Sequence, residues 1–162
     1  MELDAGRHEV TVVPTGGDDP VIEATVELEE TTAYTVLATG MVDDIQPSVF
    51  EDTPGDVASN QSHVRFIHAS PDAPNVSVRV AGGPEVFSDV AFRDASEYTP
   101  VDAGTYDLEV MPTGSEDIAL ALSDISFDGG TAYTAIAVGQ AAEGTLDAIL
   151  AEDAAMQLAA DD

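Results

Sequence analysis

The 162-residue sequence contains no cysteine, no lysine and no tryptophan. Without cysteine, the chain can form neither disulfides nor thiolate nucleophiles nor cysteine-ligated metal sites. No apolar run approaches the roughly 20 residues of a membrane-spanning helix, so we expect no membrane insertion. Residues 1–10 also lack the basic start and the apolar middle of a signal peptide. The compartment is therefore not fixed by these absences, and a cytoplasmic location is the alternative to export.

Positive charge is scarce as well. Four arginines stand against 32 Asp and Glu residues, which gives a formal net charge of -28 at pH 7, while hydrophobic residues still make up 44% of the chain. Such a charge repels itself in dilute buffer, because the Debye length is roughly 30 Å at 0.01 M salt and roughly 3 Å at 1 M. The composition predicts a halophilic protein from a haloarchaeon or a similar organism. An acidic mesophilic surface protein is the alternative, although such a protein usually retains some lysines.

The same charge excludes two kinds of partner. Nucleic-acid binding uses Lys and Arg to neutralise phosphates, and anionic membrane surfaces attract basic segments. We therefore expect no nucleic-acid partner and no binding to an anionic membrane.

Two passages of the chain resemble each other. LDAGRHEVTVVPTG near the start is similar to VDAGTYDLEVMPTG about a hundred residues later, and the similarity continues with one residue of slippage. The matching segments are residues 3–16 with 101–114, 32–40 with 131–139, and 46–53 with 146–153. Similar segments in the same order at near-constant spacing indicate a tandem duplication.

Apolar and polar residues alternate along both copies. Tyr106, Leu108 and Val110, for example, alternate with Asp107 and Glu109, which is the period of a β-strand. The expected strands are residues 8–13, 21–28, 33–39 and 48–50 in the first copy, and 64–68, 76–80, 86–92, 106–111, 118–122, 125–127, 132–138 and 146–150 in the second. Many short strands at a spacing of about 8–12 residues predict an all-β, immunoglobulin-like antiparallel β-sandwich.

The two copies differ in length. The second begins near His63, about three strands before the shared passage, whereas the first begins within it. The predicted domains are a partial first repeat at 1–53 (a C-terminal half), a linker at 54–62, a complete second repeat at 63–153 and an acidic tail at 154–162. Half a sandwich exposes a sheet face and an edge, which invites pairing with another chain. A shortened chain is the favoured explanation. Packing on the second copy, or a homo-oligomer through the incomplete repeat, are the alternatives.

Three stretches of the second copy carry a family resemblance. HVRFIHASPDAPNVSVRV at 63–80, YTPVDAGTYDLEVMPTG at 98–114 and GTAYTAIAVG at 130–139 resemble the domain-of-unknown-function family 4397, with its HASPDAP loop, its PAGTYD-like turn and its TAYT strand. The resemblance covers residues 63–153 well and residues 3–53 as a partial copy. It implies a β-sandwich that often occurs in tandem on secreted or envelope proteins, hence an extracellular or cell-surface location. It implies no established activity, cofactor or catalytic residue.

The HASPDAP stretch holds the first candidate site, formed by His68, Ser70 and Asp72. His68 and Ser70 lie two residues apart at a strand end and therefore share one face, and the sequence from Ser70 suits a type I turn. A hydrolase triad is the functional alternative, but it needs a histidine that bridges nucleophile and acid, and no G-x-S-x-G motif is present. We expect a structural turn, no catalytic residue and no enzyme.

Acidic pairs are the second candidate. Asp18 and Asp19 occupy the same loop of the repeat as Glu116 and Asp117, and carboxylates with backbone carbonyls are the ligands that calcium prefers. Among 32 acids, however, adjacent pairs arise often, so we expect no cofactor and keep calcium as a weak possibility. His63 and His68 would point to opposite faces of one strand, which disfavours a transition-metal site.

Both asparagines, Asn60 and Asn75, lie in N-x-S acceptor sequences for glycosylation. Taken together, the sequence predicts a non-enzymatic structural or adhesive module of a halophile cell-surface or secreted protein. A cation- or glycan-binding module that uses acidic loops is the alternative.

Overall fold

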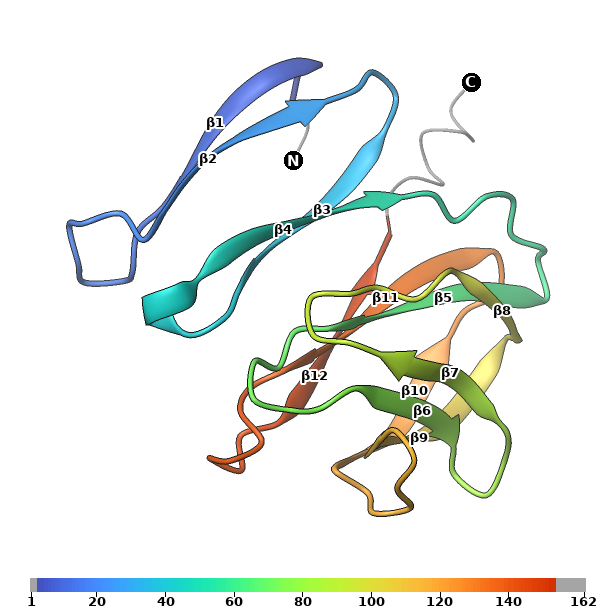
Figure 1. Cartoon of the computed structure of the whole chain (residues 1–162). Helices are drawn as coiled ribbons and strands as arrows, with labels where there is room; N and C mark the ends of the chain where they lie inside the picture. The colour runs from blue at the N-terminus through green and yellow to red at the C-terminus, as the bar shows by residue number, and fades with distance from the viewer. Residues whose placement is uncertain (1–2, 154–162) are drawn as a thin grey trace. The chain divides into compact units, whose positions relative to one another are not determined.

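The structure is a computed structural model that describes residues 3–153 (Figure 1). It divides the chain into two compact units, with the boundary between Thr53 and Pro54. The described residues form twelve strands and one 3-10 turn, η1 (Val42–Asp44), with no α-helix among them. The all-β tandem architecture predicted from the sequence is therefore confirmed.

The first unit consists of two two-stranded antiparallel sheets. Its strands are β1 (Gly6–Val12), β2 (Ile22–Leu28), β3 (Ala33–Thr39) and β4 (Gln46–Asp52). β1 pairs with β2, and β3 pairs with β4. Ile22 and Val26 are its buried apolar side chains, and they lie on the same face of β2, as the period of two requires.

The second unit consists of two four-stranded sheets, in the orders β10-β9-β6-β7 and β12-β11-β5-β8. Its strands are β5 (Gln61–His68), β6 (Val76–Val80), β7 (Glu85–Val90), β8 (Thr99–Asp102), β9 (Gly104–Pro112), β10 (Leu120–Phe127), β11 (Thr131–Val138) and β12 (Asp147–Glu152). β8 was not expected from the sequence, because it is only four residues long and contains Pro100, which is tolerated at a sheet edge.

One pair of strands in this antiparallel sandwich is parallel. β5 and β11 run parallel, with Val64 opposite Tyr133, whereas the other strand pairs of this unit are antiparallel. A parallel pair needs a long crossover connection, and strands β6 to β10 supply it here.

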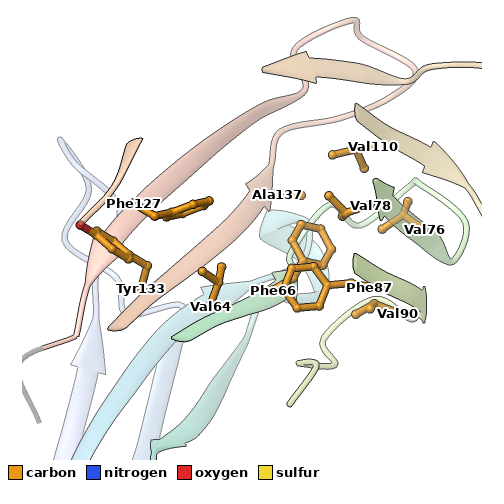
Figure 2. Close-up of a cluster of buried hydrophobic side chains, with 10 residues drawn as sticks. All are labelled: Val64, Phe66, Val76, Val78, Phe87, Val90, Val110, Phe127, Tyr133 and Ala137. Atoms are coloured by element: carbon orange, nitrogen blue, oxygen red, sulfur yellow. The ribbon is translucent and has the colours of Figure 1, made fainter. Parts of the chain in front are cut away.

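The apolar side chains of the second unit meet between its two sheets (Figure 2). Phe66 on β5 stacks on Phe87 on β7 with ring centroids 6.0 Å apart, and Phe127 on β10 lies 5.3 Å from Tyr133 on β11. Each fully buried side chain of this size contributes roughly 1.5–3 kcal/mol. The core therefore brings together strands from the beginning and from the end of the unit's sequence.

The two units share a tyrosine hydrogen bond and a pattern of strand pairing. Tyr34 accepts a hydrogen bond from the Glu29 amide at 3.2 Å, as Tyr133 does from the Asp128 amide at 3.0 Å. Pairing of β1 with β2 matches pairing of β9 with β10, except that β10 has a bulge between Leu122 and Ile125. A bulge inserts one extra residue into a strand, and this one is the single residue of slippage between the copies.

The pairing registers also correct one alignment. Thr39 lies opposite Gln46, and its equivalent Val138 lies opposite Asp147, so Gln46 corresponds to Asp147 rather than to residue 146. The loop before β12 is two residues longer than the loop before β4, which produces the shift.

The segment assigned to a linker is part of the second unit. Residues 61 and 62 are the first two residues of β5, and Pro54 accepts a hydrogen bond from the His63 ring at 2.6 Å. The chain at Ser59 also packs so closely on Gly129 that a Cβ there would lie 2.0 Å from the Ser59 carbonyl oxygen. The predicted acidic tail at 154–162 lies outside the described residues.

Candidate functional site

The HASPDAP loop connects β5 to β6, and its histidine is its most buried member. His68 is 0% exposed and Ser70 is 1% exposed. The His68 ring donates from Nε2 to the Pro74 carbonyl at 2.9 Å and accepts the Ser70 amide at Nδ1 at 3.2 Å. Both ring nitrogens therefore bind backbone atoms of the loop and fix its path.

Ser70 and Asp72 continue this chain of contacts towards a second loop. The Ser70 hydroxyl lies 3.4 Å from one carboxylate oxygen of Asp72. The same carboxylate accepts hydrogen bonds from the backbone amides of Ala141 and Ala142 at 2.7 and 2.9 Å. These two amides lower the pKa of Asp72 below its usual value, because they bind the charged form.

The three side chains do not form a hydrolase triad. A triad places a ring nitrogen of the histidine on the nucleophilic hydroxyl, but both nitrogens of His68 have backbone partners and the Ser70 hydroxyl points to Asp72. The geometry suits a clamp that holds the 70–74 and 140–145 loops together.

Asp72→Asn tests this clamp. We expect the Ala141 and Ala142 amides to exchange hydrogen faster in the variant, because a neutral amide is a weaker acceptor than a carboxylate. In the native chain the folded pKa is depressed, so the stabilisation is present above the unfolded pKa of about 3.9. It is lost as the pH falls through the folded pKa. Hydrogen exchange read by mass spectrometry along a pH series measures both effects.

Asp117→Asn is the matched control, because Asp117 is also exposed and carries the same charge. Equal changes at residues 141 and 142 in the two variants would contradict a specific role of Asp72.

The acidic pairs lie in equivalent hairpin loops. Asp18, Asp19, Glu116 and Asp117 are all exposed. The two loops turn alike, with the Gly17 amide bonded to the Pro14 carbonyl at 2.9 Å and the Ser115 amide to the Pro112 carbonyl at 3.0 Å. Within residues 3–153 no group of three or more His, Asp or Glu side chains is placed to hold a metal ion. Each loop presents two carboxylates to solvent.

Both asparagines of the acceptor sequences are exposed. Asn60 lies in the turn before β5, and its carbonyl accepts the Ala103 amide at 3.0 Å. The Asn75 side-chain nitrogen donates to Asp89 at 3.0 Å. The serines of both sequences, Ser62 and Ser77, are buried.

Two hollows occur in the second unit. A cavity of about 40 Å³ lies between the sheets and is lined by apolar side chains and Tyr106. An open groove of about 310 Å³ follows β7 and residues 94–99, and its lining includes Asp89, Asp94 and Glu97. The groove lining contains no histidine, lysine, arginine or cysteine, so its carboxylates are the side chains there that could act as a general base.

A buried polar network on the sheet β12-β11-β5-β8 was not predicted from the sequence. Arg65 on β5 donates to the Thr134 hydroxyl at 3.0 Å, and this hydroxyl donates to both oxygens of Asp153 at 2.9 and 3.0 Å. Tyr98 donates to Asp153 at 2.6 Å, and its ring lies 4.8 Å from the Arg65 guanidinium. Burial, with the bond to Asp153, raises the pKa of Tyr98. Arg65 and Asp153 are 3% and 7% exposed, so the network holds two oppositely charged side chains in the interior, joined through the Thr134 hydroxyl.

The fold and these contacts define an all-β repeat protein whose units are sandwich-like. No helix of membrane-spanning length and hydropathy occurs between residues 3 and 153. The chain belongs to the family described as "Domain of unknown function (DUF4397)", whose model matches residues 1–79 and 80–162 in succession. The boundary between the two matches falls inside β6, so the matches and the compact units divide the chain at different places. No curated protein gives a significant match.

Proposed function

We propose that this chain is a non-enzymatic structural or adhesive β-sandwich module of a secreted or cell-surface protein from a halophilic organism, a haloarchaeon being the favoured source. The observation that carries the proposal is the use of the polar groups of the HASPDAP loop. The polar side chains of this loop form hydrogen bonds with backbone atoms and with each other, as His68, Ser70 and Asp72 show. Side chains engaged in this way support a rigid loop rather than a reaction.

Charge supports the halophilic part of the proposal. A net charge of -28 with no lysine keeps a protein soluble at molar salt, where its self-repulsion is screened. The two exposed acceptor asparagines, Asn60 and Asn75, support export. A glycan mass on either residue in protein purified from its native cells would strengthen this part, whereas two unmodified residues would remove its support.

A cation-binding module is the second candidate, because Asp18 with Asp19 and Glu116 with Asp117 present paired carboxylates in equivalent loops. Calcium sites of useful affinity need six to eight oxygen ligands, and two exposed carboxylates in a loop supply only a part of them. Binding of a glycan by these acidic loops belongs to the same alternative.

Calcium titration separates the two candidates. We expect a flat calorimetric titration of the full chain with calcium in molar potassium chloride, since the monovalent salt screens weak association with the acidic surface. Saturable binding that disappears in an Asp18→Asn, Asp19→Asn variant, or in a Glu116→Gln, Asp117→Asn variant, would contradict the proposal and favour the cation-binding module.

A further inference from the structure

The apolar cavity of about 40 Å³ lies between the two sheets of the second unit. Every strand from β5 to β12 contributes at least one side chain to its lining. Six of the lining residues are core residues labelled in Figure 2, namely Val64, Phe66, Val78, Phe87, Val110 and Phe127. The cavity therefore belongs to the second unit alone and depends on the complete set of its strands.

Small side chains on two neighbouring strands leave this space. Ala135 on β11 and Ala148 on β12 both line the cavity. Ala137 lies opposite Ala148 in the strand register, on the same face as Ala135, and is buried in the core. In the first unit the position of Ala135 is occupied by Val36. The repeat thus accepts valine at this strand position, and the alanine of the second unit leaves room that a valine would fill.

The lining offers very little for a water molecule to bind. Among the residues that line the cavity, Tyr106 has the one polar side chain, and its hydroxyl donates to the Asp102 carbonyl at 2.7 Å. A buried water needs about two to four polar partners, so we expect the cavity to stay dry. A dry apolar cavity takes apolar molecules, because they supply the van der Waals contacts that the lining side chains lack.

The volume limits the size of the ligand. One water-sized sphere occupies roughly 10–15 Å³ of such space, so the cavity of about 40 Å³ holds about three of them. This space corresponds to a hydrocarbon of about three or four carbon atoms. A polar or charged molecule would lose its hydration on entry without regaining hydrogen bonds. The cavity therefore selects for small size and for the absence of polar groups.

A path into the cavity passes side chains that are only partly covered. Val86, Val101, Leu108 and Ala135 line the cavity and are half-buried. Leu122, another lining residue, lies at the bulge of β10, where strand pairing is locally interrupted. Side chains that reach solvent change rotamer within nanoseconds. A small ligand therefore enters without unfolding of the unit.

We propose that the cavity between the sheets of the second unit is a binding site for an uncharged hydrocarbon group of about three or four carbon atoms. Side chains of both sheets contact the ligand, and Ala135 and Ala148 determine the space that it fills. The chemistry is the same for a free small molecule and for the end of a longer alkyl chain. This inference does not rest on the proposed structural or adhesive function.

Methyl NMR spectroscopy of the full chain in molar potassium chloride tests the site. Butane added at increasing pressure should shift the methyl signals of Val64, Val78 and Val101 in a saturable manner, whereas Val10 on β1 is the reference and should not shift. Amides of β5 to β12 that exchange hydrogen through unfolding of the unit should slow by the factor 1 + [L]/Kd. This factor is about 10-fold at a butane concentration of ten times Kd.

Octyl glucoside below its micelle concentration distinguishes the two sources of the ligand, because it presents the end of an alkyl chain on a polar head. Saturable shifts of the same methyl signals by octyl glucoside would assign the site to a chain end, and shifts by butane alone would assign it to a free small molecule. The absence of saturable shifts with both probes would overturn the proposal.

Ala135→Val is the variant that fills the cavity. We expect its affinity for butane to fall about 10-fold, because the two methyl groups of valine take the space of about two ligand carbons. Amide exchange of β5 to β12 without ligand shows whether the variant keeps its fold. If exchange is faster, Ala148→Val fills the same cavity from the neighbouring strand and takes its place. Ala121→Val is the matched control, because Ala121 is exposed on β10 outside the lining, and it should keep the affinity.

Two results would show that the cavity is a packing gap only. The first is a butane response that is equal in the parent chain and in both filled variants. The second is a long-lived water molecule with nuclear Overhauser contacts to the Val78 methyl groups, since a hydrated cavity would not favour an apolar ligand.

Discussion

Replacing Arg65 by methionine is expected to lower the free energy of unfolding of the second unit by about 3–5 kcal/mol. The guanidinium is 3% exposed and faces Asp153 through Thr134, and Asp153 is itself 7% exposed. Without the arginine the carboxylate stays buried with hydroxyl donors only. A buried charge without its counter-charge costs several kcal/mol, because its hydration is lost and not replaced. Since a domain has only about 5–15 kcal/mol of stability, the loss is large.

Urea unfolding in molar potassium chloride measures this effect, since urea leaves the ionic strength unchanged. Arg79→Met is the matched control, because it removes the same charge from the same unit. Arg79 pairs with Glu109 at 2.6 Å, but the two side chains are 32% and 17% exposed. Partly exposed pairs contribute about 0.2–1 kcal/mol. Similar losses for Arg65→Met and Arg79→Met would show that net charge, and not burial of the network, determines the result.

A second substitution separates the charge from the packing of the side chain. Asp153→Asn added to Arg65→Met removes the buried carboxylate, so we expect the double variant to recover part of the stability that Arg65→Met loses. A double variant less stable than Arg65→Met would mean that the carboxylate acts mainly through its bonds to Thr134 and Tyr98.

Strand positions were predictable because most strands are covered on one face only. β9 alternates in sequence from Tyr106 to Val110, with Tyr106, Leu108 and Val110 on the core side, and this period is visible without any tertiary contact. β8 was missed because Thr99–Asp102 is too short to show a period and is held by pairing with β5. A sequence pattern shows only the alternation within a strand, whereas the extended structure of a four-residue edge strand is fixed by its pairing with a neighbouring strand.

The buried network was not predictable from alternation, and one signal for it was overlooked. In VRFIH the arginine alternates with Val64 and Phe66, which reads as a solvent-facing position. Ile67 and His68, however, extend the run so that β5 is buried on both faces, and a run without alternation is typical of such a strand. The partners Tyr98, Thr134 and Asp153 are far away in the chain, so only the fold shows that they converge.

The HASPDAP loop was also predictable only in part. The turn chemistry of Ser70 and Pro71 and the shared face of His68 and Ser70 were visible in the sequence. The contact of Asp72 with the Ala141 and Ala142 amides joins loops about seventy residues apart. A contact between residues so far apart in the chain leaves no local pattern in the sequence.

Transfer from molar potassium chloride to about 10 mM salt is expected to abolish most of the β-sheet circular dichroism of the chain. Folding brings 32 acidic side chains together with only four arginines, and the repulsion among them grows as the Debye length rises from roughly 3 Å to roughly 30 Å. The first unit should unfold at the higher salt concentration of the two units, since its sheets have two strands and a smaller buried core. Hydrogen exchange of β1 to β4 against β9 to β12 along the salt series measures this order.

Screening and solute exclusion both stabilise folded proteins in concentrated salt, and a neutral osmolyte distinguishes them. Sucrose at a concentration matched in osmolality is excluded from the protein surface but leaves the Debye length unchanged. If repulsion unfolds the chain, sucrose added at about 10 mM salt restores less structure than potassium chloride does. Full circular dichroism at about 10 mM salt without sucrose would contradict the halophilic interpretation. Equal rescue by both solutes would assign the salt effect to exclusion, and the acidic composition would then serve solubility rather than folding.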